Sequence, residues 1–406
     1  MIDVLHELLR FNAGRDPERL RLKFAKMRSS PFMFLRGSAH LFHARQRRGP
    51  LKSAPAAWCC GDMHLENFGS YLGVNGLACF DINDFDEAAL APAGTDPLHL
   101  LTSLWLAADE LGVDGDDTHA LARATLDAYA DALAGGKAHW LDARTAQGVV
   151  GRLLGQVGSR RQADLLERRS NGRGSRRRLR VDGRHALAAS EEQVERVRAF
   201  MAGLAAEQAG GERFEVLDVA RRVAGTASLG LDRYVVLVRG SVDRGGARLL
   251  DLKPARPSTL APVGGCTQPR LGNVAEREVA LQQRMQAVAL PLLQPVTFGG
   301  EPFVLRALQP GEDSLDLAAL SRGRAKRSGL RDSLAIMGRL VAWAQLRSAG
   351  RQGSATADEL IDFGRRGSGP GKWRDRLVQA SRDAATQVRA DAAVFNQACD
   401  AGIFPC

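Results

Sequence analysis

The sequence predicts an α+β protein with two lobes, one mainly helical and one built on a small antiparallel sheet. The chain has 406 residues, more than a single hydrophobic core usually supports. Both ends of the chain show apolar residues at helical spacing, whereas the middle is rich in short β-type runs separated by turn signals. We therefore expect four parts, which are helical 1–135, a connector 136–213, β-rich 214–310 and a helical remainder 311–406.

The composition is that of a soluble globular protein, with 45% apolar and 25% charged residues. No run of about 18 apolar residues appears, so we expect no membrane span. The N-terminus has an amphipathic pattern that includes acids, which is unlike a signal peptide. The six cysteines lack metal-binding spacing. We expect a reduced, cytoplasmic protein with free thiols.

The net charge of +10 comes mainly from one segment. Residues 151–185 hold eleven arginines against three acids, so the charge predicts a basic patch rather than a property of the fold. The same segment has no Phe, Tyr or Trp that would stack on bases. A solvated basic loop is therefore favoured over a nucleic-acid site, which stays open as an alternative.

The first part of the chain alternates between helical and strand patterns. Residues 1–50 predict helices, interrupted at Ser29-Ser30-Pro31. Residues 55–90 predict strand, polar loop, strand and polar loop, with AAWCC and LACFDI as the strands and GSYLGVNG as a turn-like segment. A strong helix follows Pro92, with Asp96 in its N-cap region and Gly112 near its end. The next helix is stopped by Gly135-Gly136.

The pattern of the remaining residues, 136–406, predicts a connector, a sheet and a second helical part. In the connector, VVGRLLGQ and RQADLLERR are helical patterns, and the Gly/Arg-rich stretch after them is expected to be a mobile loop. Helix resumes with EEQVERVRAFMAGLAAEQ. Residues 214–310 predict a small antiparallel sheet with one helix, AEREVALQQRMQAV. From 315 onward the pattern is helical again.

Two acidic clusters lie close together between residues 60 and 87. Asp62 and Asn67 stand five residues apart with His64 between them, and Asp84 and Asp86 follow the second strand. Hard cations prefer oxygen ligands, which this stretch supplies densely. An Asp could position a hydroxyl nucleophile, while an Asn and a later Asp could hold Mg²⁺. The alternative without a catalytic role is a pair of polar turns that flank a hairpin.

A small-residue loop and a lysine form a second constellation. Gly225, Ser228 and Gly230 belong to a loop where backbone N–H groups can approach phosphates without Cβ clashes. Lys253 lies on a following strand, and the next helix carries two acids, Glu276 and Glu278. Loop, strand lysine and helix glutamate come in the order used by a kinase small lobe. The pattern predicts nucleotide-phosphate binding, whereas Lys253 alone would also suit a solvated strand position.

Several motifs together resemble a known family. SSPFMFLRG, GDMHLENFG, DINDFDEA and VLRALQ, with the 223–240 stretch, are similar to domain-of-unknown-function family 2252, an uncharacterised bacterial family. This resemblance spans nearly the whole chain and is weakest over 136–213. The two acidic motifs also resemble the catalytic and metal motifs of the protein-kinase-like superfamily, in the manner of aminoglycoside and choline kinases.

The kinase resemblance implies roles for single residues. Asp62 would accept or orient the hydroxyl proton, with His64 beside it. Asn67, Asp84 and Asp86 would belong to the metal site. Lys253 would bind the nucleotide phosphates and pair with either Glu276 or Glu278, and Asp96 would brace the loop that carries Asp62. The sequence departs from the pattern at Cys60, which replaces a histidine, and at Ala227, which replaces a glycine.

The order of the parts also departs from the pattern, because the acidic stretch precedes the β-rich part. The resemblance therefore implies a circularly permuted two-lobed kinase-like fold, which is tolerated when chain ends lie near each other. Lys253 and Asp84 would then share one cleft, and the segment after Gln309-Pro310-Gly311 would face the adenine. Trp343 and Leu346 would pack beneath the loop that carries Asp62.

The function expected from this resemblance is an ATP- and Mg²⁺-dependent phosphotransferase that acts on a small-molecule hydroxyl, or less readily on a protein. Transfer of AMP by an inverted nucleotide is a second enzymatic alternative. A pseudokinase scaffold and a nucleic-acid-binding protein are the non-enzymatic alternatives. The sequence does not identify the acceptor.

Overall fold

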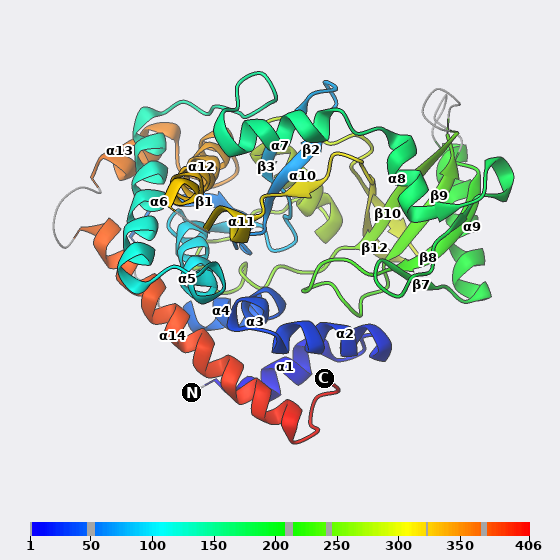
Figure 1. Ribbon diagram of the computed structural model, residues 1–406, viewed down its shortest axis with the longest axis horizontal. Coiled ribbons are helices and arrows are strands. Elements are labelled where there is room, and N and C mark those ends of the chain that lie inside the picture. The colour runs from blue at the N-terminus through cyan, green and yellow to red at the C-terminus, as the bar shows by residue number, and fades with distance from the viewer. Residues whose placement is uncertain (1, 47–52, 208–213, 241–245, 322–323, 367–371) are drawn as a thin grey trace.

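The computed structural model describes residues 2–46, 53–207, 214–240, 246–321, 324–366 and 372–406. It is an α+β protein in which a six-stranded antiparallel sheet lies at one end and long helices lie at the other (Figure 1). The expected α+β class is therefore confirmed. Smaller sheets and the N-terminal helices lie between these two ends.

Four helices open the chain, as the pattern over 1–50 predicts. Three of them begin at a residue whose side chain accepts backbone N–H groups, which are Asp3, Asp16 and Ser30. Two also have proline in the first turn, where no hydrogen-bond donor is needed. The helices are α1 (Val4–Asn12), α2 (Pro17–Arg28), α3 (Pro31–Gly37) and α4 (Ala39–Arg45).

Short strands carry the acidic stretch. β1 (Ala56–Cys59) pairs with β4 (Ala89–Pro92), and β3 (Ala78–Ile82) pairs with β2 (Phe68–Leu72), which also pairs with β13 (Asp313–Ser314). The turn expected over GSYLGVNG is wrong in its first half, because Phe68–Leu72 forms a strand. Burial overrides the turn propensity there, since Tyr71 is buried and its hydroxyl donates to the Val288 carbonyl.

The helical end surrounds an almost fully buried helix, α5 (Thr95–Leu111). Gly112 and Gly136 adopt the left-handed conformation that ends α5 and α6 (Gly115–Gly135), as predicted. Asp96 does not cap α5, whose N-cap is Gly94. The later helices are α11 (Leu317–Ser321), α12 (Arg324–Arg347), α13 (Ala357–Arg365) and α14 (Trp373–Asp400).

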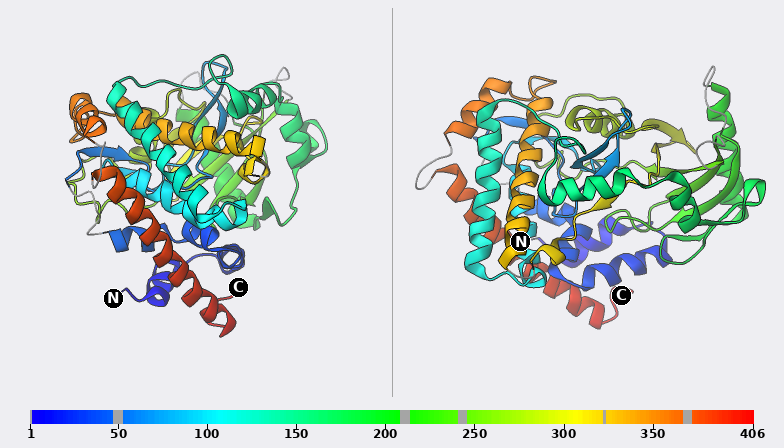
Figure 2. Two further views of the ribbon diagram at one scale, coloured as in Figure 1. Left: turned by 60° about the vertical axis from the view of Figure 1, so that its left-hand side comes forward. Right: turned by 45° about the horizontal axis from the view of Figure 1, so that its top comes forward.

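In Figure 2, α14 (red) runs beside the N-terminal helices, so the two ends of the chain pack together. Over the described ranges, no helix combines the length and the apolar character needed to cross a membrane.

The main sheet has the strand order β11-β12-β10-β9-β8-β7. Among the described residues of 214–310, one helix, α10 (Val274–Met285), lies between β10 and β11 in the chain, as the predicted sheet with one helix requires. The connector adds β7 at one edge, where it pairs with β8. The strands are β7 (Ala186–Ala188), β8 (Val216–Arg222), β9 (Tyr234–Arg239), β10 (Ala247–Pro254), β11 (Gln294–Phe298) and β12 (Glu301–Ala307).

The connector packs on both faces of this sheet. On one face, α9 (Glu191–Glu207) buries apolar side chains against β9, β10 and β11. On the other, α8 (Gln162–Arg169), which follows α7 (Gly148–Gly158), packs against Val235 and Leu249. The Gly/Arg-rich stretch was expected to be a mobile loop but instead forms a hairpin of β5 (Ser170–Asn171) and β6 (Arg178–Leu179). Burial of Leu179 holds the hairpin, and its N–H donates to Asp218 at 2.7 Å.

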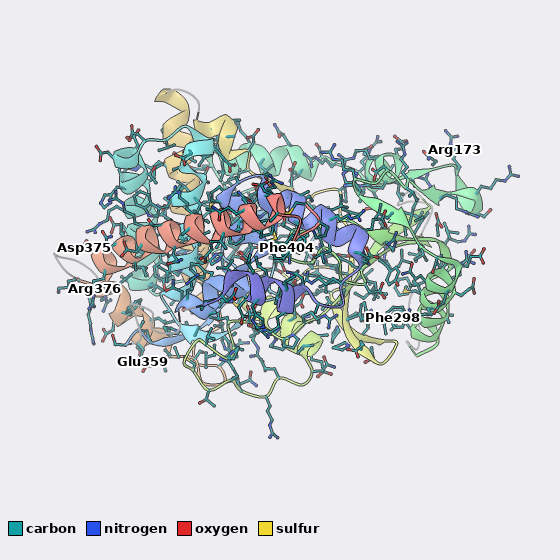
Figure 3. All side chains as sticks on the ribbon, turned by 90° about the horizontal axis from the view of Figure 1, so that it is seen from below. Arg173, Phe298, Glu359, Asp375, Arg376 and Phe404 are labelled. Carbon is teal, nitrogen blue, oxygen red and sulfur yellow. A yellow bond between two sulfur atoms is a disulfide. The ribbon has the colours of Figure 1, made fainter. Side chains whose placement is uncertain are left out.

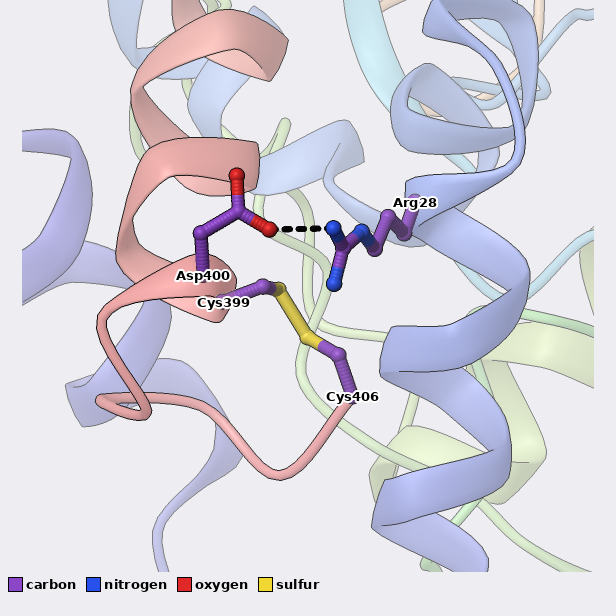
Figure 4. The surroundings of a disulfide bond; sticks show 4 residues. All are labelled: Arg28, Cys399, Asp400 and Cys406. Atoms are coloured by element: carbon purple, nitrogen blue, oxygen red, sulfur yellow. Dashed lines mark hydrogen bonds and ion pairs between the residues drawn. A yellow bond between two sulfur atoms is a disulfide. The ribbon is translucent and has the colours of Figure 1, made fainter.

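The C-terminal end turns back on α14 and is closed by a disulfide between Cys399 and Cys406 (Figure 4). The expectation of free thiols is therefore wrong for this pair, because the return of the chain brings their Cα atoms to 5.7 Å. The neighbouring Asp400 pairs with Arg28 of α2. Phe404, labelled in Figure 3, packs against Phe24, with 5.0 Å between the centroids of the two rings.

We predict that Gly338→Ala destabilises the protein by about 1–3 kcal/mol, because a Cβ there would lie 2.3 Å from the Thr125 carbonyl oxygen where α12 crosses α6. The matched control is Gly203→Ala on α9, where a Cβ would meet nothing within 4 Å. That change should stabilise the protein by up to about 1 kcal/mol. Urea unfolding of both variants measures the difference, and equal effects would contradict the close helix crossing.

Candidate functional site

The first acidic loop, residues 60–67 between β1 and β2, is fixed by Asp96 of α5. The two carboxylate oxygens of Asp96 accept the backbone N–H groups of Cys60 at 2.8 Å and Gly61 at 2.9 Å. Gly61 has φ +89°, and a Cβ there would lie 2.5 Å from the Glu87 carbonyl oxygen. Burial raises the pKa of Asp96 to about 6, although both N–H groups oppose the shift. These contacts are the brace expected for Asp96.

Asp62 is held in a mostly buried position with unused hydrogen-bonding capacity. Its side chain is 17% exposed and lies 3.5 Å from Nε2 of His99. Among the described residues, no group donates a hydrogen bond to its Oδ1. Burial, then the nearby carboxylates of Glu87 and Asp84, raises the pKa of Asp62 well above its ordinary value. Burial also lowers the pKa of His99 to about 3, so the imidazole is neutral and Asp62 is the group able to take up a proton.

Asn67 ties the first acidic loop to the second, residues 84–88. Its amide donates to the carbonyl oxygens of Asp62 at 2.9 Å and Asp84 at 3.2 Å. The Cys60 thiol donates to the same Asp84 carbonyl at 2.6 Å. The Asn67 Oδ1 is buried, and nothing in the described part of the chain donates to it. This oxygen is therefore free to act as a ligand.

Lys253 on β10 reaches the second acidic loop across 169 positions of sequence. Its Nζ lies 3.2 Å from Asp84 Oδ1, contacts Asp86, and lies 4.0 Å from Glu278 Oε1. Burial would lower the pKa of Lys253, but Asp84 and Asp86 outweigh it and raise that pKa. Burial would likewise raise the pKa of Asp84, whereas Lys253 holds it below its ordinary value. For Asp86, burial and then Asp84 raise the pKa.

The helix α10 presents only one of its two candidate acids to Lys253. Glu278 is buried and faces the ammonium group. Glu276 instead forms a capping box, in which its carboxylate accepts the Asn273 N–H at 2.9 Å. Between them in sequence, Arg277 donates to the carbonyl oxygens of Asp86 and Ala88. One helix therefore positions Lys253 and the second acidic loop together.

The glycine loop, residues 225–230 between β8 and β9, is shaped by its glycines and held by the N-terminus. Gly225 and Gly230 have φ values of +68° and +87°, which favour glycine. The guanidinium of Arg15 donates to the carbonyls of Ala227 at 2.6 Å and Leu229 at 2.9 Å. The Ser228 hydroxyl donates to the Ala224 carbonyl and accepts from Arg233, so that hydroxyl is already engaged.

A cavity of about 550 Å³ lies between the glycine loop and the acidic loops. The structure brings together several expected residues in its lining, which are Asp62, Asp84, Asp86, Ser228 and Gly230. Gly225, Asn67, Lys253, Glu276 and Glu278 do not line it.

His64 does not line the cavity either. Its Nδ1 accepts the Glu66 N–H at 3.1 Å, and burial, then Arg36, lowers its pKa well below the ordinary value. His64 is therefore a neutral group that orients its own loop.

Other residues at the site have no signal in the sequence. His43 of α4 lies in an ordinary helical pattern, yet its Nε2 is 3.0 Å from the Gly61 carbonyl and its Nδ1 is 2.7 Å from the Thr259 hydroxyl. Arg15 precedes α2 and has no distinguishing neighbours in sequence. On α12, the Trp343 ring packs against His139, and it is Gln345 that reaches the carbonyl of Ala93 at the end of β4.

The site offers a divalent cation only part of a ligand set. Among the described residues, no group of three or more His, Cys, Asp or Glu side chains is arranged to hold a metal ion. Asn67 supplies one unpaired oxygen, and the Asp84 side chain is 55% exposed toward solvent. Mg²⁺ commonly binds one or two protein oxygens and takes its other ligands from substrate phosphates and water. These residues therefore fit a cation that arrives with a phosphorylated ligand.

Comparison with known proteins gives one match. The family model described as an uncharacterized protein conserved in bacteria (DUF2252) matches residues 15–398. No curated protein and no solved structure matches the chain. The match covers both acidic loops, the glycine loop and Lys253.

We predict that Asp96→Asn destabilises the protein by about 1–3 kcal/mol, because the amide replaces one acceptor with a donor that faces a buried N–H group. The control is Asp109→Asn on the same helix, where the carboxylate is 87% exposed. Urea unfolding measures the stability of both variants. Hydrogen exchange at the Cys60 and Gly61 amides should accelerate only in Asp96→Asn, and unchanged protection there would contradict the brace.

Proposed function

Because this chain belongs to the bacterial family DUF2252, whose description assigns no activity, we propose its function from the site. We propose that it is an ATP- and Mg²⁺-dependent phosphotransferase of kinase-like type that acts on the hydroxyl of a small molecule. The observation that carries this proposal is the meeting of Lys253 with Asp84, with Glu278 beside the same ammonium group. In kinases, a lysine that lies between an acid of a loop and an acid of a helix binds the nucleotide phosphates.

The order of the parts supports a permuted form of that fold. The glycine loop joins β8 and β9, Lys253 lies on β10, and Glu278 lies on α10, which is the order of a kinase small lobe. The acidic loops precede this unit in the chain yet lie against it. The segment that follows β12 begins at Leu308 and would connect the two halves as a hinge.

The chain offers specific groups to a nucleotide and its cation. Asp84 and the unpaired oxygen of Asn67 would hold Mg²⁺, and Lys253 would bind phosphate oxygens once its acidic partners are shared with the cation. Bound Mg²⁺ would neutralise charge that develops on the transferred phosphoryl group. Gly225 and Gly230 allow the backbone of the glycine loop to approach the phosphates.

Asp62 is the group proposed to accept the acceptor's proton. The hydroxyl proton would pass to the Asp62 carboxylate, which lines the cavity and has an oxygen without a hydrogen-bond donor among the described residues. His99 stays neutral beside it and limits the positive charge that would otherwise lower the pKa of Asp62. The raised pKa makes Asp62 a stronger base than an ordinary aspartate.

Mass spectrometry tests the proposed reaction. The protein is incubated with ATP, Mg²⁺ and a metabolite extract, with Asp62→Ala as the control. A metabolite that gains one phosphate while ADP forms, and only with the wild-type protein, supports the proposal. A product that gains AMP would replace phosphate transfer with AMP transfer, and unchanged ATP would favour a scaffold.

We predict that Asp84→Asn weakens Mg-ATP binding tenfold or more, on the order of 1.4 kcal/mol, because it removes the exposed carboxylate beside Lys253. Glu276→Gln is the matched control, since Glu276 lies on the same lobe but caps α10 away from the ammonium group. Calorimetric titration with Mg-ATP gives both affinities. An Asp84→Asn variant that binds as tightly as the control would remove Asp84 from the metal site.

We predict that turnover falls as the pH drops through the raised pKa of Asp62, because the base acts only when it is deprotonated. This loss should occur at a higher pH than the value of about 3.9 for an ordinary aspartate. Asp62→Asn should lower kcat by about 10²–10⁴-fold while Mg-ATP affinity stays within a few fold. A pH–rate profile of the wild type and one titration of the variant check both statements, and wild-type kcat in the variant would show that Asp62 is structural.

A further inference from the structure

A second cavity, of about 490 Å³, lies between the connector and the main sheet. We call it the arginine cavity. The sheet side is apolar and includes Val223, Val235 and Leu249. The opposite wall comes largely from the connector, and five arginines line the cavity in total, which are Arg160, Arg168, Arg169, Arg180 and Arg222. The segment expected to be a solvated basic loop therefore builds one side of a cavity that is open to solvent.

The acids of this cavity already have partners, one of which is an arginine of the same lining. Asp313 pairs with Arg160 at 2.6 Å, and Glu312 pairs with Arg306 at 3.0 Å. Asp182 accepts backbone N–H groups of its own turn and lies 2.7 Å from Nδ1 of His185. Asp182 and Glu312 still attract the Arg169 guanidinium electrostatically, but no carboxylate among the described lining residues forms an ion pair with Arg168, Arg169 or Arg180.

Two of the arginines lack partners. Within the ranges that the structure describes, the guanidinium groups of Arg168 and Arg169 make no hydrogen bond or ion pair, and the guanidinium of Arg180 donates only to the Ser170 carbonyl. Burial lowers the pKa of Arg169, and the nearby guanidinium groups of Arg168 and Arg184 lower it further, although Asp182 and Glu312 oppose the shift. Concentrated positive charge of this kind, next to an apolar surface, favours an anionic ligand.

A cluster of arginines continues from the cavity toward Lys253. Asp251 is buried and accepts from Arg233 at 2.6 and 2.9 Å and from Arg306 at 3.3 Å, and it also pairs with Arg222, which lines the cavity. One carboxylate thus faces three guanidinium groups. Leu249, Asp251 and Lys253 alternate along β10 and share one face, so Lys253 lies roughly 13 Å along the strand from the cavity floor.

We propose that the arginine cavity binds the phosphate groups of a di- or triphosphate anion. A guanidinium group can donate two parallel hydrogen bonds to a pair of phosphate oxygens, and the guanidinium groups of Arg168 and Arg169 have N–H donors without a partner among the described residues. The phosphates could belong to a separate phosphorylated molecule, or to the proposed nucleotide held with its terminal phosphates in this cavity. The second source rests on the nucleotide binding in the proposed function and would replace its phosphate transfer by AMP transfer, whereas the anion site itself depends on neither.

With a nucleotide held that way and extended toward Lys253, its α-phosphorus would be the phosphorus nearest the acidic loops. The acceptor oxygen would then bond to the α-phosphorus, and the bond from that phosphorus to the bridging oxygen would break. Pyrophosphate would leave with the electron pair, and the hydroxyl proton would pass to Asp62. The transferred group would be AMP instead of phosphate, which gives this source a distinct product.

The test measures binding of pyrophosphate to the full chain by calorimetry. The double variant Arg168→Gln/Arg169→Gln should weaken the binding of pyrophosphate at least tenfold. The matched control is Arg173→Gln/Arg176→Gln, which removes the same charge from the same segment but outside the cavity, at the outer edge where Figure 3 shows Arg173. Thermal unfolding of both variants confirms that each is folded. An equal loss in the two variants, or no saturable binding to the wild type, would overturn the proposal.

Competition then identifies the source of the phosphates. If saturating Mg-ATP displaces pyrophosphate, and label in the α-phosphate of ATP appears in the product, the nucleotide supplies them. If pyrophosphate binds equally well in the presence of Mg-ATP, a separate phosphorylated ligand supplies the phosphates. Either result supports the anion site. Lys253→Met separates the two proposals, because it should reduce Mg-ATP affinity yet keep pyrophosphate binding, since Lys253 does not line this cavity.

Discussion

The structure depends on one buried ammonium group and the carboxylates around it. Lys253 belongs to the sheet, Asp84 and Asp86 belong to the acidic stretch, and Glu278 belongs to the helix between them. A partly buried cluster of this kind contributes little net stability, because desolvation of the ammonium offsets most of the attraction, but loss of Lys253 would leave the carboxylates around it uncompensated. The cluster therefore fixes how the two halves meet rather than how strongly each one folds.

The rest of the site is built to keep that meeting point in place. Arg277 holds the backbone of the second acidic loop, and the Glu87 carboxylate accepts the N–H and hydroxyl of Thr259. His43 connects Thr259 to the first acidic loop, whose other side is bound by Asp96. The second acidic loop is thus bound directly by groups of the β-rich half, whereas the first is linked to that half only through His43 and Thr259. The side chains that face the cavity can then remain exposed or unpaired without loss of order.

Local patterns were enough to predict most elements and the residues with distinctive chemistry. Gly112 and Gly136 end helices where expected, and the bracing contact of Asp96 was expected from resemblance to a known motif. Features that depend on distant partners could not be predicted. The pattern over Phe68–Leu72 indicates a turn, but the segment forms a strand because β3 and β13 pair with it. The spacing of Cys399 and Cys406 in the sequence does not indicate a disulfide. Arg15 has the same limitation, since its partners lie more than 200 residues away.

The packing of α14 against α5 and the N-terminal helices has a consequence for how the protein is made. The first half emerges from the ribosome early, but α14, which covers α1 and α5, is synthesised more than 260 residues after the end of α5. Contacts between such distant segments form slowly, because a long loop must close first. The apolar side of α5 therefore stays uncovered until α14 has been synthesised, and a nascent chain in that state is prone to aggregate and to engage chaperones.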